Sequence, residues 1–175
     1  MQDVDLVQMG VPDLRRIAAG EHVDTGASVV FAGALPPGHV ATLALAEIDG
    51  GTPAFWCVPF LIVSRSSRAI LGSCRFKTVP VGGEVEISYG IAPEQRGRGI
   101  GTAAIGQLLA LAAAQDSVER VVAHILPDNV ASARLAERLN FRRERVFTDL
   151  HGDTVARWVC YPRSAPSAFL TGPSR

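Results

Sequence analysis

The chain has 175 residues and a mass of 18.5 kDa, with 47% apolar, 6% aromatic and 19% charged residues. This composition is typical of a globular domain with its own core and excludes a disordered chain. Basic and acidic residues balance at 17 each, so no overall charge attracts nucleic acid or anionic lipid. The longest apolar run, residues 53–63, is too short to span a bilayer, and residues 1–5 lack a secretory signal. We therefore expect a cytoplasmic protein with one domain, residues 1–163, followed by a flexible tail at 164–175.

The cysteines and histidines do not follow the spacing of a metal site. They are far apart in the sequence: Cys57, Cys74 and Cys160, and His22, His39, His124 and His151. An odd number of cysteines without an export signal fits a reducing compartment. We predict small buried thiols and no metal.

The first half of the chain predicts two helices and then strands. Residues 12–19 begin with Pro12 and end before Gly20, as a short helix does, and residues 39–48 form a second apolar segment of helical length. Two apolar runs, 60–63 and 69–79, are separated by a polar turn and are expected to be strands.

The second half alternates strands and helices. Residues 84–91 predict a strand with Val85, Ile87 and Tyr89 on one face and Glu84 and Glu86 on the other. A loop at 92–101 leads into an apolar helix at 102–115, followed by a strand at 120–126, a helix at 130–139 and a hairpin formed by 141–150 and 154–161. The order predicts an α/β (α+β) fold whose mixed, mostly antiparallel sheet of six to seven strands is flanked by helices and is parallel around the long helix.

The loop before the long helix is suited to phosphate. Three glycines and two arginines lie within residues 96–101. Glycines allow a ligand to approach backbone N–H groups, the helix N-terminus adds a positive dipole, and arginines pair with phosphate oxygens. A mononucleotide P-loop is excluded because the only lysine is Lys77. Residues 99–104 match a dinucleotide fingerprint, but no strand runs directly into Gly99 and no acidic residue follows at the expected distance.

Three segments in register resemble the GNAT superfamily of N-acetyltransferases. The run from Ile91 to Gly101 (IAPEQRGRGIG) resembles the acyl-CoA-binding signature Q/R-x-x-G-x-G/A. Residues 129–141 resemble the N-x-x-(A/S)-x-x-L…G-F segment, with Asn140 in place of Gly, which is compatible with a left-handed backbone there. Residues 86–91 (EISYGI) resemble the E-I-G-Y-x-L strand of the ribosomal-protein N-terminal acetyltransferase-like branch.

The resemblance implies a GNAT fold and acetyl-CoA as co-substrate. Residues 58–161 would form the acetyl-CoA core and residues 1–57 a variable acceptor-side region. The implied cofactor-binding residues are Ile91, Arg96, Gly97, Arg98, Gly99, Ile100, Gly101, Thr102 and Asn129.

The implied reaction is transfer of an acetyl group from acetyl-CoA to a primary amine by direct attack in a ternary complex. Glu86 is the expected base and Glu84 its reserve, while Ser132 is the hydroxyl placed by the motif to assist the leaving thiolate. Ala136 stands where many members carry a tyrosine acid, so a tyrosine is not available for that role. The acceptor would be a protein α-amine or a small amine, with no nucleic acid or membrane partner, and the resemblance leaves room for a homodimer. The alternative is a non-catalytic acyl-CoA-binding sensor on the same fold.

Overall fold

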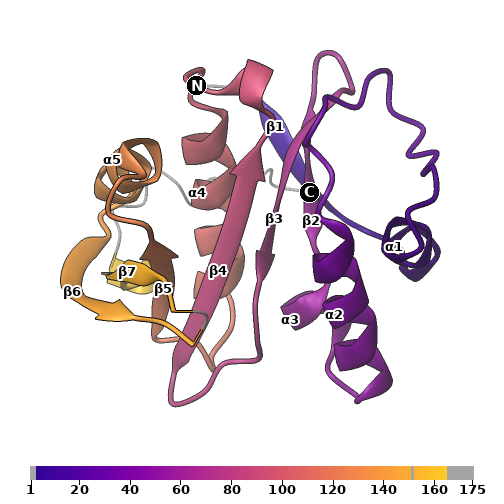
Figure 1. Cartoon of the computed structure of the whole chain (residues 1–175). Helices are drawn as coiled ribbons and strands as arrows, with labels where there is room; N and C mark the ends of the chain where they lie inside the picture. Colours follow the sequence, from indigo (N-terminus) through magenta and orange to yellow (C-terminus); the bar gives the residue numbers. More distant parts are fainter. Residues whose placement is uncertain (1–2, 151, 165–175) are drawn as a thin grey trace. The chain divides into compact units, whose positions relative to one another are not determined.

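A computed structural model describes residues 3–150 and 152–164 of the chain (Figure 1). The strands are β1 (Val4–Gln8), β2 (Phe60–Ser64), β3 (Ile70–Phe76), β4 (Glu84–Ile91), β5 (Arg120–Ile125), β6 (Arg142–Thr148) and β7 (Thr154–Cys160). The helices are α1 (Val11–Ala18), α2 (Gly38–Asp49), α3 (Ala54–Cys57), α4 (Ile100–Ala113) and α5 (Val130–Arg138), with short 3-10 turns at Pro93–Gln95 and Pro162–Ser164.

The chain forms two compact units. The first unit contains the residues up to Val79 together with Ser88–Ile105, and the second contains Pro80–Ile87 together with the residues from Gly106 onward. Strand β4 and helix α4 each contribute residues to both units.

The first unit places helices α1 to α3 beside strands β1 to β3. Strand β1 pairs antiparallel with β2, which pairs antiparallel with β3. In α1, Leu14 and Ile17 are buried at i,i+3 spacing while Arg15 and Arg16 are exposed, so this helix packs through one apolar stripe. The core is built from Met9, Leu14, Ile17, Val23, Ala34, Ala41, Ala44, Cys57, Val58, Leu61, Val63, Ile70 and Ala92.

Strand β3 approaches the end of β4 very closely, immediately before the glycine-rich loop. A Cβ atom on Gly72 would lie 2.2 Å from the carbonyl oxygen of Gly90, so only glycine allows this approach. The N–H of Ala92 donates to the carbonyl of Leu71 at 2.9 Å. These contacts fix the point at which the chain leaves β4.

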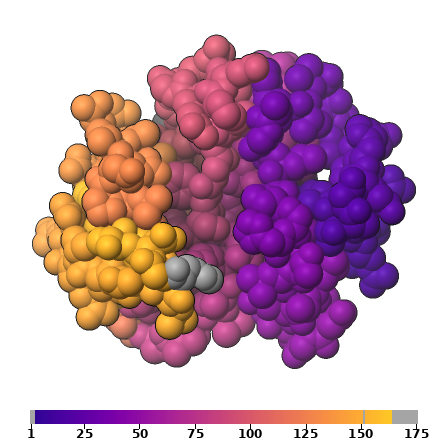
Figure 2. Space-filling view, viewed as in Figure 1, coloured from indigo at the N-terminus to yellow at the C-terminus, as the bar shows by residue number. Residues whose placement is uncertain are grey.

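The second unit carries the predicted parallel pair. Strand β4 runs parallel to β5, with Val85 beside Val121, and both side chains are fully buried. Strand β7 then pairs antiparallel with β5 and with β6, so it lies between them. Helix α5 and the β6–β7 hairpin, orange to yellow in Figure 2, lie next to each other on the face shown.

The strand order is β1-β2-β3-β4-β5-β7-β6, a mixed and mostly antiparallel arrangement that confirms the predicted fold class. The predicted helices and strands are all present, with bounds shifted by a few residues, and β3 ends at Phe76 rather than at residue 79. Strand β1 and helix α3 were not predicted. The predicted tail lies almost wholly outside the described residues. Among the helices of the described residues, none is long and apolar enough to cross a membrane.

Candidate active site

The glycine-rich loop connects β4 to α4 within the first unit. Gly97 and Gly99 have φ angles of +75° and +78°, in the left-handed region that other residues rarely adopt. A Cβ atom on either would meet nothing within 4 Å, so the backbone conformation, and not lack of space, requires glycine there. Gly101 differs, because it lies inside helix α4 and has no positive φ.

The two arginines of the loop are exposed and only partly engaged by the protein. Nε of Arg96 donates to the carbonyl of Ile91 at 3.1 Å, and Nη1 of Arg98 donates to Oε1 of the buried Gln95 at 3.3 Å. Within the described part of the chain their other N–H donors have no protein partner. These two contacts orient the side chains and leave guanidinium groups that can bind an anion.

Helix α4 begins immediately after this loop. The N–H of Ala103, in the first turn, donates to the carbonyl of Gly99, just before the helix, at 3.1 Å. The preceding N–H groups of the first turn cannot find an acceptor inside the helix. Together with the helix dipole, they give this end of α4 the character of a phosphate site.

In the second unit, Glu86 lies on the partly exposed face of β4. Val85 and Ile87 on either side of it are 0% and 3% exposed, whereas the Glu86 side chain is 25% exposed. Its Oε1 lies 3.1 Å from Nδ1 of His124 on the neighbouring strand β5. The predicted alternation of β4 is therefore present at this residue, and the carboxylate has a specific partner.

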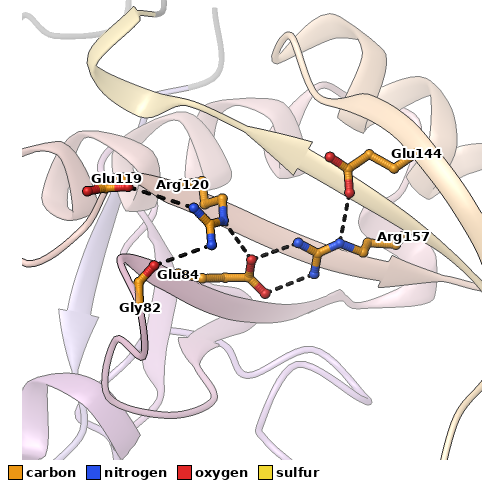
Figure 3. Close-up of polar contacts among 6 residues, drawn as sticks. All are labelled: Gly82, Glu84, Glu119, Arg120, Glu144 and Arg157. Carbon is orange, nitrogen blue, oxygen red and sulfur yellow. Dashed lines mark hydrogen bonds and ion pairs between the residues drawn. The ribbon is translucent and has the colours of Figure 1, made fainter.

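Glu84, on the same face of β4, is held in a network of ion pairs (Figure 3). Arg157 donates to both of its oxygens at 2.8 and 2.7 Å, and Nε of Arg120 donates to Oε2 at 2.8 Å. Arg157 also donates to Glu144 at 2.9 Å, and Arg120 donates to the carbonyl of Gly82 at 3.3 Å.

This network makes Glu84 a poor proton acceptor. The hydrogen bonds from Arg157, and then those from Arg120, lower the pKa of Glu84 to about 2, against the opposing effect of partial burial. A carboxylate that releases its proton so readily takes one up only in strong acid. Glu86 is thus the better candidate of the two for the base.

Asn129 and Ser132 lie at the start of α5. Oδ1 of Asn129 accepts a hydrogen bond from the backbone N–H of Ser132 at 3.1 Å, which makes Asn129 the helix N-cap. The Ser132 side chain is half-buried, and its hydroxyl has no partner among the described residues. Asn140, after the same helix, has a φ of +61°, which confirms the expected left-handed conformation.

The predicted site residues therefore fall into two groups. Ile91 and residues 96–102 lie together in the first unit, while Glu86, Asn129 and Ser132 lie in the second. Sequence reasoning missed His124, which it counted only as a scattered histidine. The signal was its place on the strand parallel to β4, since the sheet brings such neighbours together.

Comparison with known proteins identifies the family and the fold. The family described as acetyltransferase (GNAT) domain matches residues 34–142. An uncharacterized N-acetyltransferase, p20, from Bacillus licheniformis is 25% identical over 91 residues, which are 51% of this chain and 51% of that protein. The chain thus spans about half the length of this curated relative.

Solved structures show the same fold at low identity. The ribosomal-protein-S5-alanine acetyltransferase from Vibrio fischeri has a TM-score of 0.66 at 15% identity, covering 94% of this chain and 96% of its own. A chimera of the spermidine N-acetyltransferase SpeG from Vibrio cholerae with hSSAT has a TM-score of 0.65 at 16% identity, covering 97% and 99%. RimJ from Mycobacterium smegmatis, in complex with CoA-disulfide, has a TM-score of 0.64 at 18% identity, covering 90% and 81%.

Proposed function

Because the chain belongs to the acetyltransferase (GNAT) domain family, we propose that it transfers an acetyl group from acetyl-CoA to a primary amine. The amine attacks the thioester directly while both substrates are bound. The observation that carries the proposal is the loop of Gly97 and Gly99, whose left-handed backbone precedes the N-terminus of α4. Such a loop suits the pyrophosphate of CoA.

The residues that would hold CoA are those of the loop and of the neighbouring helix starts. Backbone N–H groups of the loop would donate to the pyrophosphate, and the free donors of Arg96 and Arg98 would pair with phosphate oxygens. Asn129 would use the part of its amide not engaged in capping α5 to contact the CoA arm. The full set is Ile91, Arg96, Gly97, Arg98, Gly99, Ile100, Gly101, Thr102 and Asn129.

The chemistry requires a proton acceptor, a donor to the carbonyl and help for the leaving group. An amine that is charged at neutral pH must lose a proton before it attacks. Glu86 supplies the carboxylate for this step, directly or through a water molecule. The N–H of Ile91 polarises the thioester carbonyl, and the hydroxyl of Ser132 donates to the departing thiolate.

The acceptor is a primary amine, either a protein α-amine or a small molecule. Both kinds occur among the names of the similar structures, which include a spermidine acetyltransferase and a ribosomal-protein alanine acetyltransferase. We propose the class and leave the individual amine to a screen.

The first test measures binding by thermal unfolding. Acetyl-CoA and CoA, in separate samples, should raise the melting temperature, whereas NADH should not. A ligand at about 100 times its Kd adds roughly 2.7 kcal/mol of stability, which gives a clear shift. Stabilisation by NADH alone, or by no ligand, would contradict the proposal.

The second test measures turnover across a panel of peptide and small-molecule amines. Glu86→Gln should lower kcat by about 100-fold or more with little change in the Kd of acetyl-CoA. Glu119→Gln is the matched control, because the Glu119 side chain is 72% exposed and forms only a long ion pair with Arg120, at 3.7 Å. Unchanged turnover in Glu86→Gln would remove Glu86 from the mechanism, and binding without turnover of any amine would favour the acyl-CoA sensor.

A further inference from the structure

His124 and Glu86 form a carboxylate–imidazole pair on the partly exposed face of the β4–β5 sheet. Nδ1 of His124 lies 3.1 Å from Oε1 of Glu86, and the two side chains are 26% and 25% exposed. Both groups are therefore sheltered enough to keep a fixed geometry and accessible enough to exchange a proton with a bound molecule.

The rest of the unit holds the imidazole ring in place. The ring of Phe147 packs edge-on against it, with centroids 5.1 Å apart and planes at 80°. His124 also lies opposite Arg157 in the β5–β7 register. The ring thus has a carboxylate at one nitrogen and an aromatic side chain against it.

The tautomer follows from this contact. Because the Glu86 carboxylate lies 3.1 Å from Nδ1, the proton of the neutral imidazole is favoured at Nδ1, and Nε2 then bears the lone pair. Among the described residues Nε2 has no partner, so it is free to accept a proton from a ligand.

The surrounding charges are already compensated. On β7, the guanidinium of Arg157 binds Glu84 of β4 and Glu144 of β6, which keeps both carboxylates occupied. On β6, the guanidinium of Arg145 lies 5.5 Å from the centre of the Phe147 ring. Glu86 is therefore the carboxylate that the structure pairs with the imidazole.

We propose that His124 is the proton acceptor of the reaction and that Glu86 is its positioning residue. The inference rests on the proposed acetyl transfer. It assigns the proton transfer to the imidazole of His124 and leaves to Glu86 the task of orienting that imidazole. Nε2 of His124 removes a proton from the acceptor ammonium, and the neutral amine attacks the thioester carbon. The C–N bond forms and the C–S bond breaks. The second amine proton passes to the CoA thiolate or to solvent, and the imidazolium returns its proton to solvent. Glu86 stabilises the imidazolium through its negative charge, with Oε1 3.1 Å from Nδ1.

The test compares His124→Gln, His124→Gly and the matched control Glu119→Gln with the wild type, using an amine that the wild type acetylates. We expect kcat to fall by about 100-fold in His124→Gln while the Kd of acetyl-CoA changes less than twofold. Added imidazole should restore at least a tenth of the wild-type kcat in His124→Gly and should change neither the wild type nor the control.

A spectroscopic measurement separates this inference from the proposed function. The ¹⁵N shifts of His124 should show the Nδ1–H tautomer in the wild type and loss of that preference in Glu86→Gln. An unchanged kcat in His124→Gln, with an active wild type, would overturn the role of His124 and leave acetyl transfer standing. A wild type that binds acetyl-CoA and acetylates no amine would overturn both, even if the tautomer is observed.

Discussion

Gly97 and Gly99 are needed for their backbone conformation, and this gives a test of the loop that does not depend on the acceptor. At φ of +78°, alanine at position 99 is strained by about 1–2 kcal/mol, although its methyl group would contact nothing. The strain is relieved when the loop moves away from the conformation that binds phosphate.

We therefore predict that Gly99→Ala raises the Kd of CoA by about 10-fold, which corresponds to about 1.4 kcal/mol. Gly152→Ala is the matched control, because Gly152 has a φ of +87° and an equally open surrounding in the β6–β7 connection. It should lose similar stability and bind CoA normally. Isothermal titration of both variants measures the difference, and equal Kd values for the two would argue against the loop as the CoA site.

Individual residues were predictable from the sequence when their role is local. The glycines of the loop, the N-cap Asn129 and the left-handed Asn140 each depend on the backbone within a few positions, so motif and residue type indicated them. His124 was missed because its partner lies 38 positions earlier in the chain. No local pattern signals a contact that only strand pairing creates.

At the scale of elements, the network around Glu84 links all four strands of the second unit. Glu84 on β4, Arg120 on β5, Arg157 on β7 and Glu144 on β6 are joined by hydrogen bonds of 2.7 to 2.9 Å (Figure 3). The pairing of β5 with β7 and of β7 with β6 places these side chains on the same face. The network fixes the strand that also carries Glu86.

This network predicts how stability depends on pH. The pKa of Glu84 is lowered to about 2 in the folded protein, below its value in the unfolded chain, chiefly by Arg157. Its contribution to the free energy of unfolding, about 3 kcal/mol, is therefore complete above about pH 4.3 and is lost as the pH falls towards 2.

Urea unfolding of the wild type and Glu84→Gln at several pH values measures this contribution. We expect Glu84→Gln to be less stable at pH 7, with a difference that shrinks steadily between about pH 4.3 and 2. Glu119→Gln should follow the wild type throughout, because its carboxylate is exposed and screened by water. A difference that does not change with pH would show that lost packing, and not the charge of Glu84, destabilises the variant.

Helices and strands could be predicted from the sequence where one face of the element is buried and the other is exposed. Strand β4 was predicted with its observed bounds, since its alternation of apolar and polar residues is regular. Strand β1 was missed because it is short and Asp5 and Gln8 interrupt its apolar pattern. There Asp3 and Asp5 form ion pairs with Arg65 at 2.6 and 2.7 Å, contacts that only the folded sheet supplies.

At the scale of the whole molecule, the order of the strands in the sheet could be predicted only in part from the sequence. The sequence predicted a hairpin of β6 and β7, and it did not indicate which strand of the hairpin lies beside β5. The structure places β7 there, antiparallel to β5, and leaves the more exposed β6 at the edge. An edge position suits β6, whose charged residues Arg142, Arg143 and Arg145 discourage further strand pairing.

The chain forms two compact units, and we propose that they nevertheless belong to one domain, as predicted from the sequence. No linker separates the units, because β4 passes from one to the other within a single strand and α4 does so within a single helix. Breaking either unit therefore removes hydrogen bonds from an element that the other unit also uses. We predict that the chain unfolds in one cooperative transition.

The two tryptophans allow this to be measured separately in each unit. Trp56 belongs to the first unit, where its ring lies 5.2 Å from that of Phe76, and Trp158 belongs to the second, where it is 6% exposed. In Trp158→Phe the fluorescence reports only the first unit, and in Trp56→Phe only the second. Within each variant, the urea midpoint from fluorescence should coincide with the midpoint from far-ultraviolet circular dichroism. Two separated midpoints in either variant would contradict this prediction. They would show that the units unfold independently although they share strand β4 and helix α4.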